Sequence, residues 1–395
     1  MQHLPIIKAL SRAAIAADSR DVAVHQLGRL VSALRKEGDA DAEALEKLIV
    51  AASSPGRSAP TRAMRSSVAN LERMKPGVPV PVDPDSAAPL ATLVFPEDNV
   101  AQAPVFSAEV EAVVRSLTRE WEHQEELFAA GLRPSLTALI YGPPGTGKTT
   151  LALWLARELQ LPAVIARLDG LISSLLGTTA RNLGALFDFV NRYDCVLILD
   201  EFDAIAKVRD DPNEVGEIKR VVNALLQNLD GRARTGITVG LTNHETLLDP
   251  AVWRRFEVQV PIPMPELEER SAIVSGALSH APVQASEAKL IAWLTKGMSG
   301  AEVTTVCDKW QKRKIIDAKA DVAPVEIVLQ AVRTTAARFG TIDIGRYEDR
   351  DALISALARS ETARFSHQDI GHLLGVSSKT VSRRVSDSLN EVEYV

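Results

Sequence analysis

The chain has 395 residues, of which 46% are hydrophobic and 24% are charged, and its formal net charge is −6. This length predicts two or three folded domains, and the composition excludes a disordered, collagen-like or disulfide-stapled chain. The negative charge gives no general attraction to nucleic acid or to anionic lipid, so such contacts would need a local basic patch. With two cysteines, Cys195 and Cys307, and no apolar run of about 20 residues, the sequence predicts a soluble, cytoplasmic protein without a membrane segment.

Residues 1–52 have the pattern of a small helical bundle. Leucines and a valine recur at Leu27, Leu30, Val31 and Leu34, which is the spacing of one face of a helix. Shorter apolar stretches lie before and after this helix. We expect a three-helix module that binds a partner.

Residues 53–93 are expected to form an extended linker. Nine of the 21 prolines of the protein lie between Ser53 and Pro104. Proline is excluded from helix interiors and from central strands, so the segment favours an extended conformation.

From residue 94 onward, apolar strands alternate with helices. Such a pattern predicts an α/β fold with a doubly wound parallel sheet over residues 94–264, followed by a helical lid over residues 265–340. Predicted helices between the strands include Thr149–Leu159 and Val215–Leu229. The predicted strands are Leu136–Tyr141, Ala163–Leu168, Cys195–Leu199, Ile237–Leu241 and Val258–Ile262.

The segment GPPGTGKT at residues 142–149 is a complete P-loop between a predicted strand and a predicted helix. Its glycines allow backbone N–H groups to surround phosphates, Lys148 would reach the β- and γ-phosphates, and Thr149 would bind Mg²⁺. ATP and Mg²⁺ are therefore the expected ligands. The residues expected to bind the nucleotide phosphates are Gly142, Pro143, Pro144, Gly145, Thr146, Gly147, Lys148, Thr149 and Thr150.

Three further segments carry polar groups suited to ATP hydrolysis. An apolar strand ends at Asp200 and Glu201, which predicts a Mg²⁺ ligand and a base for the attacking water. Another strand ends at Asn243, whose amide is suited either to orient that water or to contact the γ-phosphate. Shortly afterwards, Arg254 and Arg255 are suited to contact a phosphate bound by a neighbouring subunit.

The series GPPGTGKT, VLILDEFDAIA, GLTN and LDPAVWRRFE resembles the AAA ATPase family, and within it the group that contains katanin and spastin. The resemblance extends from Val94 to Arg333. Within the lid, Gly300 and Ala301 match the family's signature near the adenine. The resemblance implies a P-loop AAA+ fold, a homo-oligomeric ring, usually a hexamer, and ATP-driven remodelling of proteins.

One departure from the family pattern concerns the first pore loop, which usually carries an aromatic residue. Here the matching positions hold Leu175 and Leu176, which offer a substrate polypeptide less contact area. This segment is either a pore loop without processive threading or an ordinary loop. A second pore loop is expected at residues 207–213.

Residues 345–395 predict a three-helix unit that resembles a helix-turn-helix, with its turn at Gly375. The candidate DNA contacts are Lys379, Thr380, Arg383 and Arg384. The unit has seven basic and eight acidic residues, a charge balance that also suits a module for protein contacts.

Three functions compete at this stage. The protein is expected to be a ring-forming ATPase that remodels or gates a protein partner. The alternatives are a DNA-associated ATPase, which would use the C-terminal unit, and a nucleotide-gated regulator of a partner enzyme.

Overall fold

The computed structural model describes most residues after position 70. The described residues are 71–99, 103–167, 176–203, 215–232, 236–317, 322–336, 344–347 and 349–392. The predicted bundle at residues 1–52, Leu175 and the expected second pore loop lie outside these residues. Leu176 begins a helix, but its side chain also lies outside the described part.

Six strands of the described residues form one sheet in the order β1-β3-β4-β5-β2-β6. Strands β2 to β6 run parallel to one another and confirm the five predicted strands, whereas β1 pairs antiparallel with β3 and was not predicted. The strands are β1 (Ala91–Val94), β2 (Thr137–Tyr141), β3 (Ala163–Ala166), β4 (Val196–Leu199), β5 (Thr238–Thr242) and β6 (Val258–Pro261).

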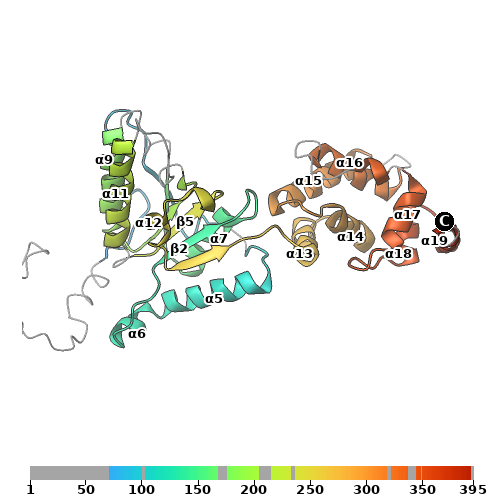
Figure 1. Cartoon of the computed structure of the whole chain (residues 1–395), viewed down its shortest axis with the longest axis horizontal. Coiled ribbons are helices and arrows are strands. Elements are labelled where there is room, and N and C mark those ends of the chain that lie inside the picture. The colour runs from blue at the N-terminus through green and yellow to red at the C-terminus, as the bar shows by residue number, and fades with distance from the viewer. Residues whose placement is uncertain are drawn as a thin grey trace, which may run out of the picture. The chain divides into compact units, whose positions relative to one another are not determined.

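Helices cover both faces of the sheet, which confirms the predicted α/β class. Helices α9 and α11 lie side by side against one face, and α5 and α7 pack against the other (Figure 1). In β4, Leu197 and Leu199 join the first core, and Val196 and Ile198 join the second. The helices of this part are α5 (Ala108–Glu122), α6 (Gln124–Ala129), α7 (Lys148–Glu158), α9 (Leu176–Val190), α11 (Val215–Arg232), η1 (Glu245–Leu247) and α12 (Pro250–Trp253).

Residues 71–94 pack against the sheet, although their proline content predicted a linker that extends to residue 93. Met74 and Leu90 are buried in the core beneath α9 and α11, and Asp83 accepts a hydrogen bond of 2.9 Å from Asn182 of α9. Proline is compatible with an extended segment at a sheet edge, where β1 lies. The packed region therefore begins ahead of the expected boundary at residue 94.

Among the described residues, four helices follow the sheet at the position of the predicted lid: α13 (Leu267–Ala277), α14 (Ala285–Leu294), α15 (Gly300–Ile316) and α16 (Pro324–Ala336). Their apolar faces meet around the buried Trp310. The side chains of Ser299 and Glu302 form a capping box at the start of α15. This cap fixes the helix end that faces the P-loop.

The predicted C-terminal helices are also present. They are α17 (Arg350–Ala358), α18 (His367–Leu374) and α19 (Ser378–Val392), and a short turn of 3₁₀ helix, η2 (Ile344–Tyr347), precedes them. Gly375 ends α18 with a φ of 67°, a left-handed conformation that favours glycine. At Gly371, a Cβ would lie 2.8 Å from the carbonyl oxygen of Val376, so only glycine allows the two segments to approach this closely.

The C-terminal helices share one hydrophobic core with the lid. Leu353, Ile370 and Val381 are buried in the same cluster as Leu290 and Trp310. Three short helices have little interior of their own, and the shared core provides the burial that they lack.

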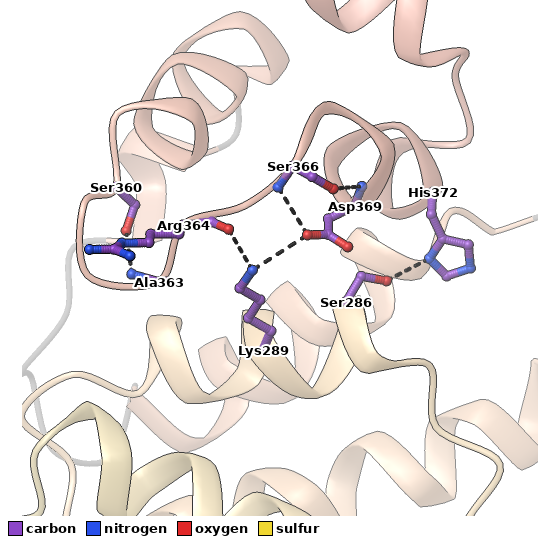
Figure 2. Close-up of polar contacts among 8 residues, drawn as sticks. All are labelled: Ser286, Lys289, Ser360, Ala363, Arg364, Ser366, Asp369 and His372. Carbon is purple, nitrogen blue, oxygen red and sulfur yellow. Dashed lines mark hydrogen bonds and ion pairs between the residues drawn. The ribbon is translucent and has the colours of Figure 1, made fainter.

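Polar contacts reinforce this junction between α14 and the C-terminal helices (Figure 2). The ammonium group of Lys289 donates to the carbonyl oxygen of Arg364 at 2.7 Å and lies 3.4 Å from a carboxylate oxygen of Asp369. The hydroxyl of Ser286 and Nδ1 of His372 are 2.8 Å apart. The C-terminal helices are therefore built onto the lid.

None of the helices among the described residues is long and apolar enough to cross a membrane.

Candidate functional site

A cleft of about 540 Å³ opens where β2, β4 and β5 end and where the lid meets the sheet. Parallel strands of open α/β sheets bind ligands at this edge. The cleft is lined by Pro104, Val105, Pro144, Gly145, Thr146, Gly147, Lys148, Thr149, Thr150, Asp200, Glu201, Asn243, Ile273, Gly300, Ala301 and Thr304.

The P-loop lies between β2 and the first turn of α7. Gly145 and Gly147 have φ values of 75° and 96°, which favour glycine and let the backbone turn around the loop. A Cβ at Gly145 would also lie 2.6 Å from the hydroxyl of Ser299. The amide of Ala301 donates to the carbonyl oxygen of Gly145 at 3.0 Å, so the lid touches the P-loop directly.

Lys148 points into the P-loop. Its ammonium group donates to the carbonyl oxygens of Gly142 at 2.8 Å and of Pro143 at 2.7 Å. Gly142 and Pro143 do not line the cleft, but their carbonyl oxygens hold Lys148, which does. Burial lowers the pKa of Lys148, and the negative charges of nearby carboxylates, with Asp200 the strongest, oppose that shift.

Thr149 and Asp200 come together as expected for a Mg²⁺ site. The Thr149 hydroxyl donates to a carboxylate oxygen of Asp200 at 2.9 Å. Mg²⁺ prefers oxygen ligands and commonly binds through one or two protein groups together with substrate phosphates. In the described residues, no cluster of three or more ionisable metal ligands forms a separate metal site. This donor set fits Mg²⁺ held jointly with a nucleotide.

Glu201 lies in the cleft with an exposed side chain. Its φ of 48° is in the left-handed region, which carries strain for a residue with a Cβ. The amide of Glu201 donates to a carboxylate oxygen of Asp200 at 2.9 Å, and this bond helps to hold the conformation. The carboxylate of Asp200 therefore holds the backbone at Glu201, whereas the carboxylate of Glu201 is exposed in the cleft.

Arg254 and Arg255 do not line the cleft. Both are exposed, and the carbonyl oxygen of Arg255 accepts a hydrogen bond of 2.9 Å from Thr137, the first residue of β2. The P-loop follows the other end of that strand, at Tyr141. With about 3.3 Å per residue, the strand separates its two ends by roughly 13 Å. Arg255 also forms an ion pair of 2.6 Å with Asp230.

The structure thus brings Pro144–Thr150, Asp200, Glu201, Asn243 and the Gly300–Ala301 pair into one cleft. It adds four lining residues that the sequence analysis missed: Pro104, Val105, Ile273 and Thr304. Of these, Thr304 had a usable signal, since it is one helical turn after Gly300. The others lie in segments without a motif.

The candidate DNA contacts on α19 separate into two groups. Lys379 and Arg383 are exposed on one side of the helix. Thr380 is half-buried, and Arg384 forms an ion pair of 2.6 Å with Asp351 of α17. Arg384 was expected to face DNA, but this pair turns it toward α17.

Comparisons with known proteins found a matching family model, a similar sequence and a similar fold. The family model described as "ATPase family associated with various cellular activities (AAA)" matches residues 138–264. An uncharacterized AAA family ATPase, y4kL, from Sinorhizobium fredii (strain NBRC 101917 / NGR234) is 37% identical over 239 residues, which cover 60% of this chain and 72% of that relative. The crystal structure of the FIGL-1 AAA domain matches with a TM-score of 0.51 and 23% identity, covering 61% of this chain and 85% of that one, a likeness of fold alone.

Proposed function

The chain belongs to the AAA ATPase family and is an ATP hydrolase, and from this premise we propose that it forms a homo-oligomeric ring that remodels or gates a protein partner. The observation that carries the proposal is the distance of Arg254 and Arg255 from the cleft of their own subunit. Arginines that stabilise transferred phosphoryl groups are commonly supplied by another protein molecule. A ring, most simply a hexamer, would bring these arginines to the cleft of the next subunit.

Within one cleft, each side chain has a proposed task. Lys148 leaves its two backbone carbonyls to bind the β- and γ-phosphates, and Thr149 and Asp200 hold Mg²⁺. When bound, Mg²⁺ neutralises phosphate charge. Glu201 accepts a proton from the attacking water, and Asn243 orients that water.

The lid contributes the remaining wall. Gly300 and Ala301 begin α15 and, with Ile273 of α13 and Val105 ahead of α5, form the part of the cleft wall that the lid and the segment before α5 supply. We assign the adenine to this part. The closer relationship to the katanin and spastin group rests on the motif series and on this lid signature.

A protein partner is favoured because the family resemblance implies protein remodelling. Leu175 stands where an aromatic pore residue is usual, which favours limited remodelling or nucleotide-dependent gating of a partner enzyme over processive threading. The same proposal assigns the protein to the cytoplasm, where Cys195 and Cys307, both free and buried, stay reduced.

The proposal is tested by capture of the partner in its native cell. The Glu201→Gln protein should retain ATP and hold its partner, so purification with ATP should recover a protein that survives nuclease treatment. Loss of every associated protein after nuclease, with DNA as the retained species, would contradict protein remodelling. Wild-type protein purified with ADP is the control.

A DNA-associated ATPase is the second candidate, and the charge distribution of the C-terminal unit favours it. From residue 349 to residue 386, a range that leaves out Asp387 and Glu391 in the second half of α19, the sequence has six basic and four acidic residues. Two of the acids, Asp351 and Asp369, pair with Arg384 and Lys289. The side chains of Lys379 and Arg383 are exposed to solvent. The first nine residues of α19, which include both, contain no acidic residue.

The Lys379→Ala/Arg383→Ala protein is the test of this second candidate. If α19 binds duplex DNA, the substitutions should weaken binding by roughly tenfold and reduce its salt dependence by about two charges. Fluorescence anisotropy at several salt concentrations measures both effects. Arg119→Ala/Lys312→Ala removes two exposed positive charges from α5 and α15 and should leave binding unchanged, whereas equal losses in both double variants would contradict a surface on α19.

A further inference from the structure

Thr242, the last residue of β5, contacts three parts of the nucleotide site at once. Its hydroxyl donates to a carboxylate oxygen of Asp203 at 2.7 Å and accepts a hydrogen bond of 3.0 Å from the amide of His244. Its carbonyl oxygen accepts a hydrogen bond of 3.4 Å from the amide of Gly142, the first residue of the P-loop. The Thr242 residue is only 1% exposed, so water does not compete for these bonds.

The direction of each bond is determined by chemistry. A hydroxyl has one proton to donate, and an ionised carboxylate only accepts. Asp203 therefore accepts the hydrogen bond that the Thr242 hydroxyl donates, and the same hydroxyl oxygen accepts a hydrogen bond from the amide of His244. The carboxylate of Asp203 thus fixes the orientation of the Thr242 hydroxyl, and that hydroxyl holds the backbone turn from Thr242 to His244.

Asn243 lies between the two ends of this turn. A threonine oxygen that accepts the amide two residues later closes a small local turn, which here holds Asn243 between Thr242 and His244. Asn243 lines the cleft together with Glu201. The side chain of Thr242, which does not line the cleft, thus holds the conformation of Asn243, the residue assigned to orient water.

Asp203 ties this turn to the segment that carries the catalytic acids. It comes three residues after Asp200, and β4 and β5 are neighbours in the sheet. The hydrogen bond between Asp203 and Thr242 joins residues 39 positions apart. It therefore links the segment that carries Asp200 and Glu201 to the turn that carries Asn243.

We propose that Asp203 and Thr242 are positioning residues for ATP hydrolysis, which hold Asn243 in register with Glu201 and with the P-loop. Neither residue was assigned a role from the sequence. The alternative role is electrostatic, because Asp203 also contributes negative charge near Lys148. The two roles predict different kinetics: a charge effect changes nucleotide binding, whereas a positioning effect changes the chemical step.

Thr242→Val keeps the shape of the side chain and removes both of its hydrogen bonds. We expect kcat to fall by roughly 10- to 100-fold, the loss typical of a small misplacement at a reacting centre, while KM for ATP stays within about twofold. Thr242→Ser and Asp203→Asn keep an oxygen in the required place and should retain most of the turnover. Asp203→Ala should match Thr242→Val, and the double variant should be no slower than either alone, because both remove one interaction.

Thr238→Val is the matched control. Thr238 is the first residue of the same strand, is fully buried, and its hydroxyl has no hydrogen-bond partner among the described residues. The substitution removes a threonine hydroxyl from β5 at the end remote from the cleft. Its kcat should equal that of the wild type.

A second readout separates positioning from a general loss of structure. Binding of ADP with beryllium fluoride mimics the ground state, whereas ADP with aluminium fluoride mimics the transition state with water in line. Thr242→Val should bind the first as the wild type does and the second more weakly, by about the factor lost in kcat. Equal weakening of both complexes, a raised KM with unchanged kcat, or a Thr242→Ser protein as slow as Thr242→Val would each overturn the proposal.

Discussion

Replacement of Glu201 by Gln is expected to leave ATP binding intact and to slow hydrolysis by about 100-fold or more, because general base catalysis contributes at least this much. Gln has the shape of Glu but cannot accept the proton of the attacking water. The backbone bond from residue 201 to Asp200 does not involve the side chain of residue 201, so the local geometry should persist. Steady-state ATPase rates and equilibrium binding of ATP measure the two expectations.

Glu245→Gln is the control for loss of charge alone. Glu245 also contributes negative charge near Lys148, but it does not line the cleft. Its turnover should stay within about twofold of the wild type, since a screened charge outside the reacting centre alters the barrier little. Undiminished hydrolysis by the Glu201→Gln protein would remove Glu201 from its assigned role.

Replacement of Arg254 by Ala is expected to have the larger effect. An arginine supplied to a transferred phosphoryl group accelerates its reaction by about 10³- to 10⁵-fold. Arg254 is exposed and does not line its own cleft, so its removal should leave the P-loop and the affinity for ATP unchanged. The expected result is a kcat lower by roughly 10³-fold with little change in ATP binding.

Arg119→Ala controls for the removal of a surface arginine. Arg119 is exposed near the end of α5 and has no assigned role in the site. Its turnover should match the wild type. A kcat for Arg254→Ala within about threefold of this control would exclude an arginine contribution on the scale seen in phosphoryl transfer.

The sheet and most of the cleft could be predicted because their signals are local. Strands β2, β4 and β5 are short, buried apolar runs, and each is followed within a few residues by side chains that line the cleft. The C-terminal helices could also be predicted, since Gly375 ends α18 and the hydroxyl of Ser377 accepts a hydrogen bond from the amide of Thr380 at the start of α19. Helix caps and turn glycines can be recognised from a few consecutive residues.

The features that escaped prediction depend on residues far apart in sequence. Residues 71–94 carry no periodicity, and their packing is decided by a strand edge and by α9, about 90 positions later. The pair of Thr242 with Asp203 requires that β4 and β5 be neighbours, which no local pattern states. The ion pair of Arg384 with Asp351 likewise depends on the packing of α17 against α19.

The separation of the lid from the C-terminal unit shows the same limit of local patterns. The sequence suggested a lid to residue 340 and a distinct unit from residue 345. In the structure, Leu290 of α14 and Ile370 of α18 belong to one core. Helix boundaries can be read from caps, but which helices share an interior follows from packing.

The central claim is that each ATP site is completed by Arg254 of a neighbouring subunit, and mixed assemblies test it most directly. The Arg254→Ala and Glu201→Gln proteins would be co-expressed with different tags and purified through both tags, so that every assembly contains both. With random order in a ring, about one quarter of the interfaces pair an intact Glu201 with an intact Arg254. The account predicts that these hybrids hydrolyse ATP well above either variant alone. Hybrids no more active than the two parent variants combined, across expression ratios, would contradict a shared site.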